Sequence, residues 1–117
     1  MNRADKILNL VVSLDPYQGI ERRIKRAEYR DPARPKWRDL LLDIQNGVFQ
    51  MVRFQHGYST GAPTMLWEIA YADLGPVNPA WVYGIVATDR DMVRIWLGDR
   101  IGTDDKARRA ALELSAP

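Results

Sequence analysis

Residues 46–55, NGVFQMVRFQ, determine the fold predicted for this chain, because the pattern of apolar residues changes there. Asn46-Gly47 is a typical helix stop, because glycine readily adopts the left-handed conformation that closes a helix. From Val48 onward, apolar side chains alternate with polar ones, which indicates strands with one buried face. The segment therefore separates a helical first part of the chain from a sheet-forming second part.

Residues 1–47 are expected to form three helices. The first follows Asn2, a good capping residue, and carries apolar side chains at helical spacing through residue 14. The second begins after Asp15 and ends by Arg30, since a proline follows two residues later and disfavours helix before it. The third begins near Pro35 and ends at the Asn-Gly stop.

The second part of the chain predicts four strands, at residues 48–55, 64–72, 80–88 and 92–98. Short, turn-rich connections join them, so a mostly antiparallel sheet is expected. Thr103 is a capping residue for a last helix over residues 103–115. The predicted class is therefore α+β, a single domain over residues 1–117 with a helical segment (1–47), a β-meander (48–99) and a C-terminal helix.

Alternation along these strands defines two faces of the predicted sheet. One face is large and apolar, and we predict it as the core: Val48, Val52, Phe54, Met65, Trp67, Ile69, Tyr71, Trp81, Tyr83, Ile85, Val93, Ile95 and Leu97. The other face carries Phe49, Met51, Met92 and Trp96 among small residues. Either a helix covers this face, or it is a second interface, for example in a homodimer.

Composition excludes several kinds of chemistry. With 117 residues the chain has room for one ordinary core. It has no cysteine and one histidine, which excludes disulfides, thiol catalysis and thiolate or histidine-rich metal sites, so no metal or cofactor is expected. No apolar run reaches the length of a membrane span or a signal peptide, so we expect a cytoplasmic protein without a membrane partner.

Positive charge is concentrated in one part of the sequence. Residues 1–60 hold 11 basic and 7 acidic residues, whereas residues 61–117 hold 6 and 8. On a helix through Arg30, the side chains of Arg22, Arg26 and Arg30 share the face opposite Ile20. Arginine suits bidentate contact with carboxylate or phosphate. The candidate partner-binding residues are Arg22, Arg23, Arg26, Tyr29, Arg30, Arg34, Trp37 and Arg38.

These residues predict a small non-catalytic regulatory or adaptor protein. Its basic helix would dock on a larger partner, either an acidic protein surface or a nucleoprotein complex. A solvated helix face explains the same charges without any partner. Direct nucleic-acid binding is an alternative function, although no helix-turn-helix, zinc-finger or RNA-recognition signature accompanies the charges.

A second alternative is a small enzyme or ligand-binding domain that uses the loop around His56. This histidine stands close to the hydroxyls of Tyr58, Ser59 and Thr60, and a histidine beside a hydroxyl is the minimum for base-assisted nucleophilic chemistry. A hairpin loop rich in glycine, serine and threonine also explains these residues without a function. The sequence therefore leaves three functions open.

Overall fold

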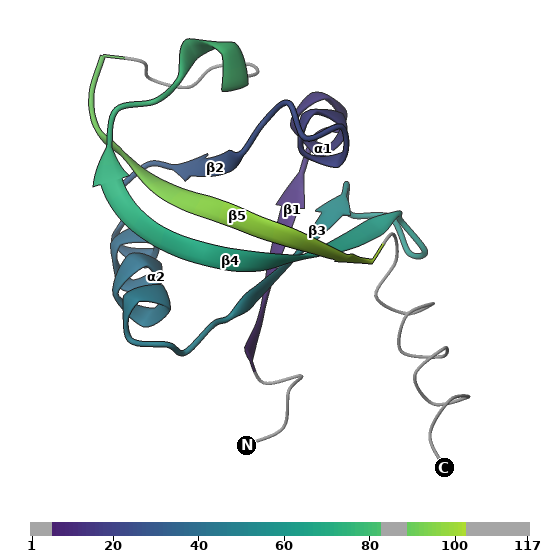
Figure 1. The fold of residues 1–117 in the computed structure, drawn as a ribbon, viewed down its shortest axis with the longest axis horizontal. Coiled ribbons are helices and arrows are strands. Elements are labelled where there is room, and N and C mark those ends of the chain that lie inside the picture. Colours follow the sequence, from purple (N-terminus) through teal and green to yellow (C-terminus); the bar gives the residue numbers. More distant parts are fainter. Residues whose placement is uncertain (1–5, 83–88, 103–117) are drawn as a thin grey trace.

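The computed structural model describes residues 6–82 and 89–102. Along the chain, its elements are β1 (Ile7–Val12), α1 (Leu14–Glu21), β2 (Ala27–Arg30), α2 (Pro35–Gln45), β3 (Met51–His56), β4 (Thr64–Gly75), the short 3-10 helix η2 (Pro79–Trp81) and β5 (Met92–Gly102). Figure 1 shows β4 and β5 as a long bent ribbon, with α2 beside it and α1 at the end of β1. Within these residues, no helix is long and apolar enough to cross a membrane.

The five strands form one mixed, curled sheet in the order β1-β3-β4-β5-β2 (Figure 1). β1 pairs in parallel with β3, from Ile7 beside Met51 to Val12 beside His56. The other three pairings are antiparallel. The two strands closest to the N-terminus, β1 and β2, are therefore the two edges of the sheet, and α1 lies between them in the chain.

The predicted layout of three helices, a four-stranded mostly antiparallel sheet and a last helix is wrong: the described residues form two α-helices and a five-stranded mixed sheet, and the difference begins in the first part of the chain. Residues 7–12 form β1 where we expected the first helix. Leu8, Leu10 and Val12 are buried, so this strand alternates, and a short apolar run of this kind fits helical and strand periods equally well. The second predicted helix ends early, since α1 stops at Glu21 and residues 27–30 form β2.

The later elements are closer to the prediction. The third helix is confirmed as α2, and three predicted strands correspond to β3, β4 and β5 with shifted ends. Part of the strand expected at 80–88 is wrong, because residues 79–81 form η2. The remainder of that strand, residues 83–88, and the C-terminal helix expected at 103–115 lie outside the described residues.

The main core lies between one face of the sheet and the two helices, α1 and α2. Most of the predicted core residues in the described part are buried there: Val52, Phe54, Met65, Trp67, Val93, Ile95 and Leu97. The prediction that Val48 and Tyr71 belong to the core is wrong, since 45% and 55% of their surfaces are exposed. The register of β4 shifts between Leu66 and Tyr71, and each extra residue turns the following side chains to the opposite face. This shift places Ala72 in the core and Tyr71 outside it.

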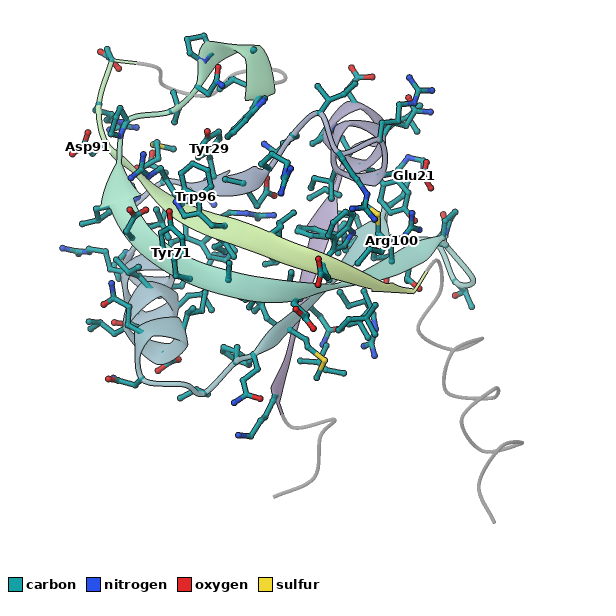
Figure 2. All side chains as sticks on the ribbon, in the orientation of Figure 1. Glu21, Tyr29, Tyr71, Asp91, Trp96 and Arg100 are labelled. Atoms are coloured by element: carbon teal, nitrogen blue, oxygen red, sulfur yellow. The ribbon has the colours of Figure 1, made fainter. Side chains whose placement is uncertain are left out.

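A smaller cluster covers the outer face of the sheet near β2. It contains Ala27, Tyr29, Val77 and Met92, with Trp81, Val82 and Trp96 packed against it. Figure 2 shows Tyr29, Trp96 and Tyr71 in a column across β2, β5 and β4. The chain between β4 and β5, which includes η2, therefore covers part of the face that the sequence left open.

Candidate functional site

A large recess lies between the two edge strands of the sheet. It has a volume of about 600 Å³ and is lined by residues of β1, β2, the start of α2 and the chain around η2 and β5. Arg30 Nη2 donates to the Val11 carbonyl oxygen at 3.3 Å, so a β2 side chain reaches the backbone of β1. We call this recess between β1 and β2 the seam.

Within residues 6–82 and 89–102, no strand pairs with the outer side of β1 or of β2. The Val12 carbonyl accepts the Gly57 N–H at 3.2 Å on the β3 side, so the neighbouring Val11 directs its backbone away from β3. The Leu97 N–H donates to the Arg26 carbonyl at 3.1 Å, which directs the backbone groups of Ala27 toward the free edge of β2. An open sheet edge of this kind is a place where another chain can pair.

Three side chains form an ionic network in the seam. Glu28 Oε2 lies 2.8 Å from Arg30 Nη2, and Glu28 Oε1 lies 3.3 Å from Lys25 Nζ. Lys25 Nζ also donates to the Trp81 carbonyl at 2.9 Å. The side chains of Lys25 and Glu28 are only 4% and 7% exposed. Side chains, and not ladder hydrogen bonds, therefore bridge the two edges.

Burial controls the electrostatics of this network. Desolvation lowers the pKa of Lys25 from its ordinary value, and the Glu28 carboxylate opposes that change. Burial likewise raises the pKa of the Tyr29 phenol, whose oxygen accepts the Asn78 N–H at 3.0 Å. Arg30 Nε is buried without a hydrogen-bond partner in the described part of the chain. The guanidinium therefore retains an unused donor inside the seam.

Positive charge exceeds negative charge along the seam. Among the described lining residues, the cations are Lys25, Arg30, Arg34 and Arg90, and the carboxylates are Glu28 and Asp31. Arg90 forms an ion pair with Asp31, and Glu28 is shared by two cations. Arg34 stands at the N-cap of α2, whose first turn has no acidic residue, so the helix dipole adds to its charge.

The structure divides the predicted partner-binding residues into two groups. Tyr29, Arg30, Arg34 and Trp37 line the seam, and Arg30 and Lys36 lie over the two-ringed side chain of Trp37 at 4.7 and 4.5 Å. The remaining residues are exposed outside the seam lining: Arg22, Arg23, Arg26 and Arg38. The prediction that Arg22, Arg26 and Arg30 share one helical face is wrong. The three residues lie at the end of α1, in a loop and on β2, respectively.

Sequence reasoning missed four charged residues of the lining: Lys25, Glu28, Asp31 and Arg90. On a helix, Lys25 would lie between the carboxylates of Glu21 and Glu28, at spacings of four and three residues. Of these two carboxylates, the described structure pairs Lys25 with Glu28. The pair between Asp31 and Arg90 spans 59 positions of the chain, so no local pattern indicates it. The sequence signal that could have indicated the network was a lysine and a glutamate three residues apart, beside aromatic residues.

The residues of the predicted second interface do not meet on one surface. Met51 and Met92 are buried, at 6% and 3% exposed. Phe49 packs against the main core, whereas Trp96 belongs to the outer cluster. Trp96 stacks on the exposed Tyr71, with ring centroids 5.8 Å apart. The only one of the four next to an exposed aromatic patch is therefore Trp96.

The predicted His56 loop is also divided. The His56 ring lies 5.7 Å from the ring of Tyr17, beside a recess of about 390 Å³. Neither Tyr58 nor Ser59 lines that recess, and Tyr58 is 89% exposed. The described structure therefore does not assemble the histidine and these hydroxyls into one site.

No group of three or more histidine, cysteine, aspartate or glutamate side chains among residues 6–82 and 89–102 is placed to hold a metal ion. Comparisons of the chain with family models, with curated protein sequences and with solved structures found no match. The residues of the seam are therefore the basis for assigning a function.

Proposed function

We propose that this protein is a small non-catalytic binding module, a regulator or adaptor, that docks on an acidic segment of a larger protein through the seam. The observation that carries this proposal is the recess of about 600 Å³ between β1 and β2, in which four cations face two carboxylates. A volume of this size can hold several side chains of a bound peptide. Complementary charge would speed association and select acidic partners.

The shape of the seam favours a protein segment over a nucleic acid. A phosphate backbone is bound by exposed cations along an extended groove, together with exposed aromatic rings. In the seam, Lys25 is 4% exposed and Arg30 is 19% exposed, so both charges are recessed. The ring of Trp37 already carries Arg30 and Lys36. Recessed cations fit a carboxylate side chain that enters from outside.

The test compares two arginines with the same charge and different positions. Arg34 lines the seam, whereas Arg22, the C-cap residue of α1, does not. We expect labelled decaglutamate to bind the wild-type protein, and Arg34→Glu to weaken binding about tenfold, since reversal turns an attraction into a repulsion. Arg22→Glu should have a much smaller effect. Fluorescence anisotropy at low and physiological ionic strength measures both.

Two outcomes would contradict the proposal. Equal weakening by Arg22→Glu and Arg34→Glu would mean that general charge, and not the seam, attracts the peptide. Tighter binding of a single-stranded oligonucleotide than of decaglutamate, with a steep loss of affinity on adding salt, would support direct nucleic-acid binding instead. Circular dichroism of each variant checks that the fold is intact.

A further inference from the structure

We infer that the acidic segment binds as an extended strand, which pairs its backbone with the free edge of β2 inside the seam. This inference rests on the proposed function and specifies the conformation of the partner. Strand addition to an open sheet edge is a general way of recognising peptides, in which main-chain hydrogen bonds supply affinity and side-chain pockets supply specificity. The evidence comes from the backbone of β2, the position of Glu28 and the opposite edge of the seam.

The first evidence is the direction of the β2 backbone. Among the strands of the described residues, β2 pairs with β5 alone, and its antiparallel register places Ala27 opposite Trp96 and Tyr29 opposite Arg94. Because the Arg26 carbonyl accepts the Leu97 N–H, Ala27 and Tyr29 direct their N–H and C=O groups away from β5. Ala27 is fully buried and does not line the seam, so Tyr29 is the residue of β2 that can offer its backbone groups to an incoming strand there.

The second evidence is that Glu28 occupies the place of such a partner. Its Oε1 accepts the Tyr29 N–H at 3.2 Å, a donor that a neighbouring strand would otherwise bind. Its Oε2 accepts from Arg30 Nη2 at 2.8 Å. One carboxylate of the chain thus stands in for both a backbone carbonyl and an acidic side chain. A bound strand would supply a carbonyl to Tyr29 and a carboxylate to Arg30.

The third evidence comes from the opposite edge. The Val11 carbonyl faces the seam and is held by Arg30, which also has its buried Nε without a described partner. The seam therefore presents polar backbone on both sides and cations between them. Its lining also contains apolar side chains, among them Val12 and Met92. An extended peptide with alternating acidic and apolar residues is complementary to these walls.

The main experiment uses the wild-type protein and three peptides of identical charge. The probe is acetyl-Val-Glu-Val-Glu-Val-Glu-amide. It is compared with two analogues, one N-methylated at every valine and the other N-methylated at every glutamate. N-methylation removes backbone donors without changing charge, and alternate residues of a strand face opposite edges. We expect the unmodified peptide to bind, and at least one methylated peptide to bind about tenfold or more weakly.

The outcomes separate this inference from the function on which it rests. If all three peptides bind equally well, strand pairing is overturned, while docking of an acidic segment stands. If none of the three binds, both proposals are overturned. Loss of affinity for one methylated peptide only supports pairing and identifies the residues that face β2.

A second arm tests the role of Glu28 as a stand-in. Glu28→Gln keeps an acceptor for the Tyr29 N–H and removes the charge that competes for Arg30, so we expect affinity for the unmodified peptide to rise about tenfold. Glu68→Gln, an identical change at an exposed position of β4, is the matched control. Equal effects of the two variants would overturn this role. The peptide comparison remains decisive if Glu28→Gln does not fold.

Discussion

At the scale of single residues, the seam depends on the unequal positions of Lys25 and Glu28 in their network. Lys25 shares Glu28 with Arg30, and Glu28 has two cationic partners. Removing Lys25 leaves the carboxylate paired, whereas removing Glu28 leaves two recessed cations without their carboxylate. Breaking a buried pair in the second way costs about 3–5 kcal/mol, mainly because a charge remains buried without compensation.

This asymmetry gives a prediction for stability. We expect Lys25→Met to lower the free energy of unfolding by about 1–2 kcal/mol, since it removes one buried hydrogen bond to Trp81 and also relieves the desolvation of an ammonium group. We expect Glu28→Met to lower it by at least about 3 kcal/mol. Urea unfolding at neutral pH measures both. The network model fails if the lysine variant is the less stable of the two.

Asp73 gives a prediction for the pH dependence of stability. Arg94 donates to its two carboxylate oxygens at 2.8 and 2.7 Å, and Trp96 Nε1 donates at 3.2 Å. The hydrogen bonds from Arg94, and then that from Trp96, lower the pKa of Asp73 below its ordinary value of 3.8, while burial opposes them. The unfolded chain therefore binds more protons in acid, so this stabilisation is present above 3.8 and is lost as pH falls through the folded-state pKa.

The measurement is the melting temperature of the wild type and of Asp73→Asn across acidic pH. The wild type should melt higher near neutral pH, and the difference should shrink as the medium is acidified toward about pH 2. A difference that stays constant over this range would show that Asp73 acts through packing and not through its charge.

At the scale of secondary structure elements, the two helices show what the sequence could and could not predict. Both end in the same arrangement: the N–H of Ile24 bonds to the Gly19 carbonyl at 2.9 Å, and that of Val48 bonds to the Asp43 carbonyl at 2.9 Å. The residue before each has a positive φ, 79° at Gly47 and 62° at Arg23. Glycine indicates such a turn and arginine does not, so only the end of α2 was predictable.

The edge strand β2 was not predicted, for a related reason. The missed stop at Arg23 extended the second helix over β2, and this single error placed Arg22, Arg26 and Arg30 on one face. The irregular register of β4 likewise moved Tyr71 out of the predicted core. Both are local departures from a regular period, and period was the main information available from one sequence.

At the scale of the whole molecule, the candidate site depends on long-range pairing. The seam joins residues from β1, β2, α2 and the segment around β5, and it exists because the sheet curls with β1 and β2 as its edges. The sequence predicted half of the charged and aromatic residues that line the seam, since basic and aromatic side chains are dense between residues 22 and 38. Strand order determines which of them face each other, and no local pattern specifies strand order.

An open seam also predicts how backbone amides exchange with solvent. Along β1, Leu10 and Val12 direct their N–H groups toward β3, whereas Asn9 and Val11 direct theirs toward the seam. Along β2, Ala27 is fully buried and the Tyr29 N–H is bonded to Glu28 Oε1 at 3.2 Å, so neither amide is expected to exchange rapidly. We therefore expect hydrogen exchange, followed by NMR, to alternate along β1, with the outward amides exchanging at least about tenfold faster.

The same measurement distinguishes an open edge from one covered by a second copy of the chain. Exchange that alternates along β1 at every protein concentration supports a seam that is free to accept a partner, and adding the alternating acidic peptide should then slow exchange further at Tyr29. Uniform protection along β1 and β2 that disappears on dilution would mean that the edges pair between two copies. In that case the seam would be an interface of a homodimer, and an acidic partner would bind only where it displaces the second copy.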